Sequence, residues 1–165
     1  MTILALVLLC NNDVKMKANL GLIALIVWAL SVVLLGYFFV RGWTSAASDQ
    51  RTAIHLAPAE RDLVLGEMRQ MLHSVHNLVT GLSAGDAKIM EQAARASGMA
   101  MAADANPLLM AKLPLDFKRQ GLSVHRDFDS LAEKIAGGAD QATVLREFTG
   151  ITARCVGCHT SYRLP

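Results

Sequence analysis

The stretch PAERDLVLGEMRQMLHSVHNLVTGL, residues 58–82, decides the fold class. Its apolar side chains recur at steps of three and four residues, which is the spacing of one face of an α-helix. Pro58 in the first turn, followed by Glu60 and Asp62, marks the start of a helix, and Gly81–Gly85 marks its end. The predicted inward face consists of Leu63, Leu65, Met68, Leu72, Val75, Val79 and Leu82.

The chain that follows repeats this helical spacing. Residues 83–104, rich in alanine and methionine, predict a second helix, and residues 115–136 predict a third. A fourth begins with Asp140 as its cap and runs to about Tyr162. No window alternates polar and apolar side chains as a strand does. Residues 58–165 therefore predict an all-α domain, an antiparallel four-helix bundle with space for a cofactor in its core.

An uncharged run of 21 residues, Leu20–Val40, precedes this domain. About 20 residues of helix cross a hydrocarbon core roughly 30 Å thick, so residues 20–42 predict a transmembrane anchor. Lys15 and Lys17 precede the run, which by the positive-inside rule places residues 1–19 in the cytoplasm. The rest of the chain then lies across the membrane, which for a bacterial inner membrane means the periplasm.

Two alternatives concern this N-terminal part. Ser45–Ala47 would suit cleavage of a signal peptide, but the apolar run is longer and more aromatic than such peptides usually carry. Met16 offers a second start, in which case residues 1–15, with Cys10, are an extension outside the protein. Residues 43–57 are rich in small and polar side chains and predict a linker.

The composition excludes several classes of function. The net charge is +2, and from Trp43 onward 13 Lys and Arg balance 13 Asp and Glu. Nucleic-acid binding would need a basic surplus. Three cysteines are too few for a disulfide-stabilised scaffold. Because the sequence shows no nucleophile and no acid–base pair, we do not expect an enzyme.

Cys155-Val-Gly-Cys158-His159 is the Cys-x-x-Cys-His signature of covalent c-type haem attachment. Cysteines three apart on a helix project from one face, where both can add to the vinyl groups of one porphyrin. His159 then lies beneath the ring as the proximal iron ligand. A thioredoxin-like pair, half of a zinc site and a local disulfide are the alternatives, and none has its usual sequence context here.

The tail CVGCHTSYR, Cys155–Arg163, resembles the C-terminal motif of the class II cytochromes c, the group of cytochrome c′ and cytochrome c556. The resemblance covers about residues 57–165 and implies a four-helix bundle with one haem on the last helix. It also implies that Arg163 lies near a haem propionate. The alternative for Arg163 is a charge at the C-terminal end of the helix that complements the helix dipole. The N-terminal anchor departs from the soluble members of that family.

The resemblance implies that the first helix of the bundle faces the distal side of the iron. In the c556-like members a methionine ligates the iron there, and in cytochrome c′ an apolar residue screens an open site. Met68 is the predicted distal ligand, because it shares the inward stripe and suits the distance to the following loop. The family's arginine-to-methionine spacing is not kept, so His73, His76 and an open site behind Leu65 remain alternatives.

These features predict a membrane-anchored electron carrier. We expect it to exchange single electrons with a redox partner protein, such as a membrane-bound oxidoreductase. One alternative is a cytochrome c′-like protein that binds nitric oxide or carbon monoxide. Another is a tethered cytochrome subunit of a larger membrane complex. The family resemblance also allows a homodimer.

Overall fold

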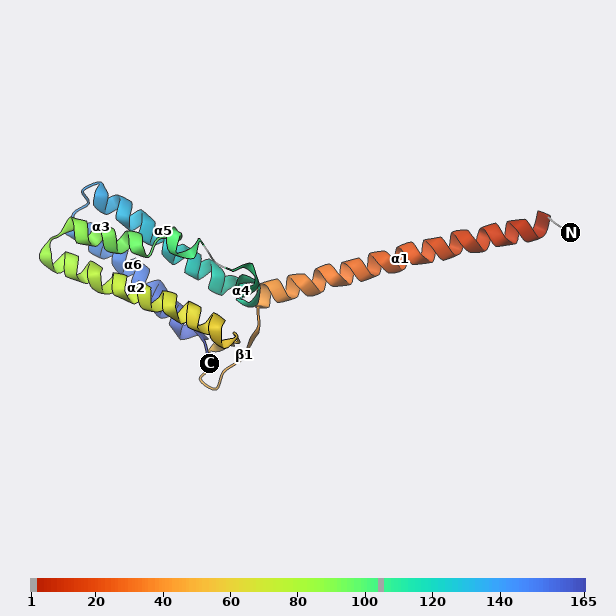
Figure 1. Ribbon diagram of the computed structural model, residues 1–165, viewed down its shortest axis with the longest axis horizontal. Coiled ribbons are helices and arrows are strands. Elements are labelled where there is room, and N and C mark those ends of the chain that lie inside the picture. Colours follow the sequence, from red (N-terminus) through yellow and green to blue (C-terminus); the bar gives the residue numbers. More distant parts are fainter. Residues whose placement is uncertain (1–2, 104–105) are drawn as a thin grey trace. The chain divides into compact units, whose positions relative to one another are not determined.

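The computed structural model describes residues 3–103 and 106–165, with side chains from residue 20 onward. The described chain is mostly helical and divides into two units, residues 1–38 and 39–165, each considered by itself (Figure 1). The elements in chain order are α1 (Ile3–Arg41), β1 (Thr44–Ala46), β2 (Thr52–Ile54), α2 (Pro58–Ala84), α3 (Ala87–Ala96), the 3₁₀ helix η1 (Met99–Ala102), α4 (Pro107–Lys112), α5 (Leu115–Ala136), α6 (Gln141–Ser161) and β3 (Tyr162–Arg163).

The first, third and fourth predicted helices are confirmed as α2, α5 and α6. Local caps account for both ends of α2 and for the start of α6. The helix predicted from Pro58 is α2, whose start is stabilised by the Glu60 carboxylate accepting from the Ala57 N–H at 2.9 Å. It ends at Gly85, which has a left-handed backbone with φ of 66° that glycine adopts without a Cβ clash. The fourth predicted helix is α6, and Asp140 is its N-cap as expected.

The second predicted helix, over residues 83–104, is wrong in length. Among residues 85–103, which the structure describes, α3 is the regular α-helix, with 10 residues, and the chain turns at Gly98. Asp129 of α5 accepts a hydrogen bond from the Met99 N–H at 2.8 Å, and its carboxylate lies so close to Gly98 that a Cβ would collide. This tertiary contact ends the helix despite the high helix propensity of the Ala-Met sequence that follows.

The chain is mostly helical, as expected, but a small sheet that was not predicted is also present, in the order β1-β2-β3. β1 and β2 form an antiparallel hairpin within the predicted linker, and β2 pairs in parallel with β3 in the C-terminal tail. We call the hairpin, residues 44–54, the strap. Its strands have three residues each, too few to show alternation in the sequence. The pairing satisfies backbone groups that would otherwise lack partners.

Two clusters of buried side chains form the core of residues 39–165. In the larger cluster α2, α3, α5 and α6 all take part. The larger cluster consists of Leu78, Met90, Ala93, Ala94, Val124, Phe128, Leu131, Ala132, Ile135, Val144, Phe148 and Ile151. The smaller cluster consists of Ile54, Val64, Leu109 and Leu113, with Met68, Phe117 and Tyr162 packed against it. The smaller cluster therefore joins the strap to α2, α4 and α5.

The inward face of α2 is rotated from the predicted stripe. Leu63, Leu72 and Val79 were expected inside, but they are 50%, 67% and 51% exposed. Gly81 lies inside instead. α3 approaches α2 so closely here that a Cβ at this position would be 2.6 Å from the Met90 side chain, and glycine has none. The close approach of α3 thus selects a face that apolar periodicity alone does not reveal.

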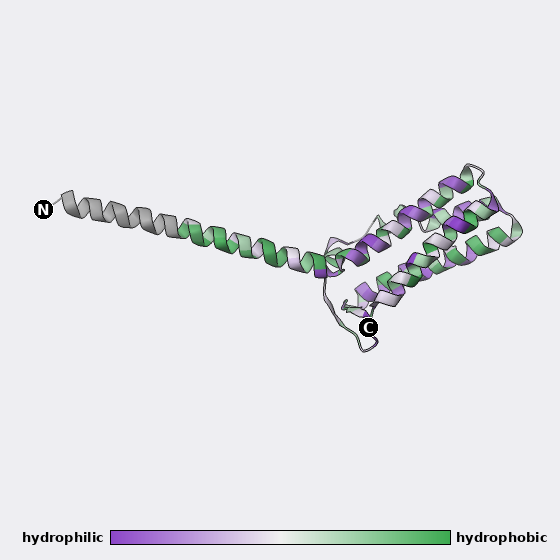
Figure 2. Cartoon of the chain, turned by 180° about the vertical axis from the view of Figure 1, so that it is seen from behind, coloured by the Kyte–Doolittle hydropathy of each residue, from purple (hydrophilic) through white to green (hydrophobic). Residues whose placement is uncertain are grey.

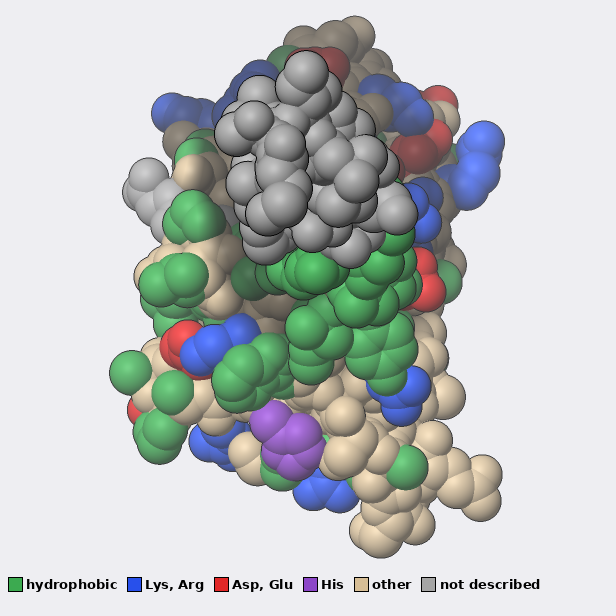
Figure 3. Space-filling view, turned by 90° about the vertical axis from the view of Figure 1, so that its right-hand side faces the viewer, with side chains coloured by type: hydrophobic (Ala, Val, Ile, Leu, Met, Phe, Trp, Pro, Cys, Tyr) green, Lys and Arg blue, Asp and Glu red, His purple; other side chains and the backbone are tan. Residues whose placement is uncertain are grey.

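Within α1, Leu20–Arg41 is long and apolar enough to cross a membrane. The side chains of this segment are exposed, and hydropathy colouring shows a mostly apolar surface along it (Figure 2). The space-filling view shows its hydrophobic side chains beside one another (Figure 3). The side chains of Cys10, Lys15 and Lys17 lie outside those that the structure describes.

Replacing Asp140 by alanine is expected to lower the free energy of unfolding at neutral pH. Its carboxylate accepts from the Thr143 N–H at 2.7 Å, and this bond holds the pKa of Asp140 below its ordinary value of 3.8. The stabilisation is present above that value and is lost as the pH falls through the lowered pKa. Urea unfolding should therefore separate the variant from wild type at pH 7 and less so near pH 3. An equal loss at both pH values would contradict a charge-assisted cap, and exposed Glu133→Gln is the control.

Candidate functional site

The last turns of α6 present Cys155, Cys158 and His159. Both cysteines are half-buried and neither forms a disulfide. Burial raises the pKa of both cysteines, and for Cys158 the neighbouring Cys155 adds to the effect. Both side chains are therefore neutral thiols at pH 7. Since the two thiols are three residues apart on one helix, they lie on the same face.

Two cavities open beside this part of α6. The outer cavity, of about 230 Å³, is lined by Arg51, Leu65, Met68, Phe117, Cys158, His159, Tyr162, Arg163 and Leu164. The inner cavity, of about 120 Å³, is lined by Val64, Glu67, Met68, Met71, Phe117, Gln120, Gly121, Val124, His125, Arg154, Cys155, Cys158 and His159. Four residues line both cavities, namely Met68, Phe117, Cys158 and His159. We therefore treat the cavities as two parts of one cleft, which side chains of α2, α5 and α6 line.

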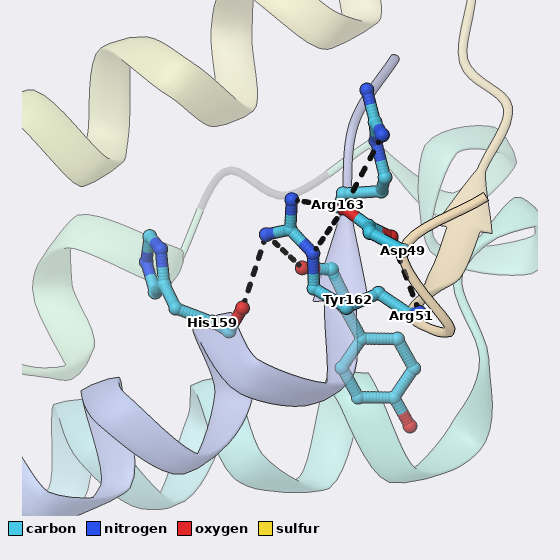
Figure 4. Close-up of polar contacts among 5 residues, drawn as sticks. All are labelled: Asp49, Arg51, His159, Tyr162 and Arg163. Atoms are coloured by element: carbon cyan, nitrogen blue, oxygen red, sulfur yellow. Dashed lines mark hydrogen bonds and ion pairs between the residues drawn. The ribbon is translucent and has the colours of Figure 1, made fainter. Parts of the chain in front are cut away.

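The outer end of the cleft is bordered by charged side chains of the strap and the tail (Figure 4). Arg51 donates to the carbonyl oxygen of His159 at 3.1 Å and forms an ion pair with Asp49 at 2.7 Å. Asp49 also pairs with Arg163 at 3.3 Å. Hydrogen bonds from Arg51 lower the pKa of Asp49, so this carboxylate is ionised at neutral pH. Two cations and one anion thus meet at this end.

The inner cavity contains two titratable side chains that the sequence did not single out. His125 of α5 is 6% exposed, and its Nδ1 lies 2.8 Å from the carbonyl oxygen of Ser97. Glu67 of α2 is partly buried, and this burial raises its pKa. Ser97 lies 28 residues from His125 along the chain, so this contact has no local signature in the sequence. No sequence signal relates these positions.

The structure brings most of the predicted site residues together. Met68 lines both parts of the cleft, Leu65 lines the outer part, and Arg163 lies at the outer end. His73 and His76 are exposed and line neither cavity. The geometry therefore favours Met68 or an open site near Leu65 over either histidine, while iron ligation itself stays a prediction.

The cleft suits a c-type haem in its chemistry. Such a group needs two thiols for its vinyl carbons, an imidazole for its iron, apolar walls for the ring and cations for its carboxylates. The cleft supplies the thiols, His159, the ring of Phe117 and three arginines, of which Arg51 and Arg163 line the outer cavity and Arg154 the inner one. A thioether, Met68, is also present for the second axial position. Among the residues that the structure describes, no group of three or more His, Cys, Asp and Glu could hold a metal ion.

No family model matches the sequence, and neither a curated protein nor a solved structure shows significant similarity to it. The functional argument therefore rests on the residues of the cleft.

Replacing Glu67 by glutamine is expected to raise the free energy of unfolding at pH 7. Because burial raises the folded-state pKa of Glu67 above its ordinary value of 4.5, ionisation opposes folding. The stability that Glu67 contributes is lost as the pH rises from its ordinary pKa through its raised folded-state pKa. Glutamine does not ionise, so the variant does not lose this stability. Urea unfolding should show the gain at pH 7 and a smaller one at pH 4. A variant less stable than wild type at pH 7 would contradict the argument.

Proposed function

We propose that this chain is a membrane-anchored, mono-haem c-type cytochrome of the class II kind that transfers single electrons. One observation carries the proposal: Met68, Cys158 and His159 line both the outer and the inner cavity of the cleft. A thiol pair with an adjacent imidazole accounts for covalent attachment. A thioether in the same cleft accounts for a second axial ligand, which suits electron transfer.

Each residue of the cleft then has a defined task. The thiols of Cys155 and Cys158 would hold the haem through two thioethers, formed by adding each S–H bond across a vinyl group, which needs no leaving group. His159 and Met68 would hold the iron, and a Met/His pair would raise the reduction potential relative to other ligand sets. The bound haem supplies the one-electron chemistry, and the chain supplies orientation and the surrounding charges.

The proposal includes the four-helix bundle of the class II cytochromes, formed by α2, α3, α5 and α6. Its support is that these helices share one buried core and that α6 carries the attachment motif. The short α3 and the strap depart from a plain bundle. α3 lines neither cavity, whereas the strap contributes Arg51 to the outer one.

We further propose that α1 anchors the protein in a bacterial inner membrane, with the haem domain in the periplasm. The support is the apolar segment Leu20–Arg41, together with the charges on Lys15 and Lys17. An anchor confines the search for a redox partner to two dimensions and raises the effective concentration. The expected partner is a membrane-bound oxidoreductase, with the chain as a free carrier, a homodimer or a subunit of a complex.

A gas-binding protein of the cytochrome c′ kind is the second candidate. The observation that favours it is Leu65, which lines the outer cavity together with His159. If Leu65 rather than Met68 faces the iron, the sixth position is open to nitric oxide or carbon monoxide.

An absorption spectrum of the purified protein, ferric, ferrous and with carbon monoxide, tests the proposal. We expect low-spin spectra, a sulfur-to-iron band in the ferric state and no response to carbon monoxide. A high-spin spectrum that shifts at once with carbon monoxide would assign the protein to the gas-binding class. A preparation from haem-maturing cells that lacks haem would refute both.

A further inference from the structure

We propose that Arg51, in the strap, is a haem-binding residue that together with Arg163 holds the propionate carboxylates at the outer end of the cleft. This inference rests on the proposed function and adds a residue, and an orientation of the haem, that the attachment motif does not specify. The strap then forms part of the haem site rather than a linker.

The lining of the cleft is asymmetric, and this asymmetry gives the orientation. Cys155 lines only the inner cavity and Cys158 lines both, whereas Arg51 and Arg163 line only the outer one. A third arginine, Arg154, lines the inner cavity but is paired with Asp127. In a haem the two vinyl groups and the two propionates lie on opposite halves of the ring. Because the thiols must meet the vinyl half, the propionates point toward the two arginines.

The side chains at the outer end of the cleft carry one positive charge that no carboxylate balances. Asp49 is shared by Arg51 and Arg163, so the three side chains carry a net charge of +1. The side chains of all three are 35–38% exposed, so water and salt screen part of this charge. The paired Nε and Nη2 groups of Arg51 already bind Asp49, so Arg51 would attract a propionate through the net positive charge, and Arg163, which contacts Asp49 through Nη1, would donate to it.

Arg51 is also placed where its charge acts on the haem ligand. Its Nη1 donates to the carbonyl oxygens of His159 at 3.1 Å and Tyr162 at 3.5 Å, whereas Nε and Nη2 bind Asp49 (Figure 4). The cation therefore sits beside the backbone of the proximal histidine. A purely structural reading is that Arg51 caps the end of α6, and the experiment must separate the two.

The test compares midpoint potentials of the purified, haem-loaded variants Arg51→Gln, Arg51→Lys and Asp49→Asn. A cation near the haem stabilises the reduced state, so Arg51→Gln should lower the potential and Asp49→Asn should raise it. Arg51→Lys keeps the charge and should stay near wild type. Arg95→Gln, which removes an equal charge from a residue of α3 that lines neither cavity, is the matched control.

If these substitutions only loosened the end of α6, Arg51→Gln and Asp49→Asn would not shift the midpoint potential in opposite directions. Equal signs for Arg51→Gln and Asp49→Asn, or shifts no larger than that of Arg95→Gln, would overturn the inference while the haem and the proposed function stand. If Arg51→Gln fails to retain haem, Asp49→Asn decides: a raised midpoint potential, with Arg51→Lys near wild type, supports the inference, and an unchanged or lowered potential overturns it. Wild-type protein without covalent haem would instead refute the proposed function, and this inference with it.

Discussion

Replacing Met68 by alanine is expected to remove the sixth iron ligand and to lower the midpoint potential. Met68 lines both parts of the cleft that contains His159, and its thioether is the second ligand that we propose. Axial ligands set haem potentials over a range of about 0.8 V, so losing the thioether should shift the potential by on the order of 100 mV. The ferric spectrum should lose its sulfur-to-iron band, and the ferrous iron should bind carbon monoxide.

Met71→Ala is the control for this prediction. Met71 lies one turn further along α2, lines only the inner cavity and packs against the larger core cluster. Its replacement should reduce stability but leave the sulfur-to-iron band unchanged. If Met68→Ala keeps the band and Met71→Ala loses it, the assignment of the ligand is wrong by one turn of helix.

Replacing Cys155 and Cys158 together by alanine is expected to abolish covalent haem attachment. Each thioether depends on one of these thiols, so the double variant should show no haem-linked band after denaturing electrophoresis, and each single variant should show a weaker one. Cys10→Ala is the matched control, because Cys10 lies outside the attachment motif. Unchanged haem staining in the double variant would contradict the motif's role.

The helices whose ends depend on local chemistry could be predicted from the sequence. Pro58, Gly85 and Asp140 act on the backbone within a few residues of themselves, so their signals are visible in one stretch of chain. The end of α3 depends instead on Asp129, which lies 30 residues further along the chain. The residues near Gly98 give no local indication of that contact.

The strap could not be predicted for a related physical reason. Its second strand pairs with Tyr162–Arg163, more than 100 residues away, and strands of two or three residues are too short to show alternation. The rotation of α2 that exposes Leu72 likewise depends on a partner helix, since Gly81 selects the buried face through its contact with α3.

The residues of the candidate site also differ in whether a local stretch of sequence identifies them. Cys155, Cys158 and His159 form a contiguous motif, so the sequence alone identified them. Met68 could be predicted only through its helical register and a family resemblance. Arg51 meets the site through contacts across the fold that no local pattern encodes.

The central claim is covalent haem at Cys155 and Cys158, and the mass of one peptide tests it most directly. Trypsin cleaves after Arg154 and Arg163 and releases the peptide CVGCHTSYR from the protein purified from haem-maturing cells. The account predicts the mass of this peptide plus one intact haem, because addition of a thiol to a vinyl group loses no atoms. The bare peptide mass, or one lower by two hydrogens for a disulfide, would contradict it.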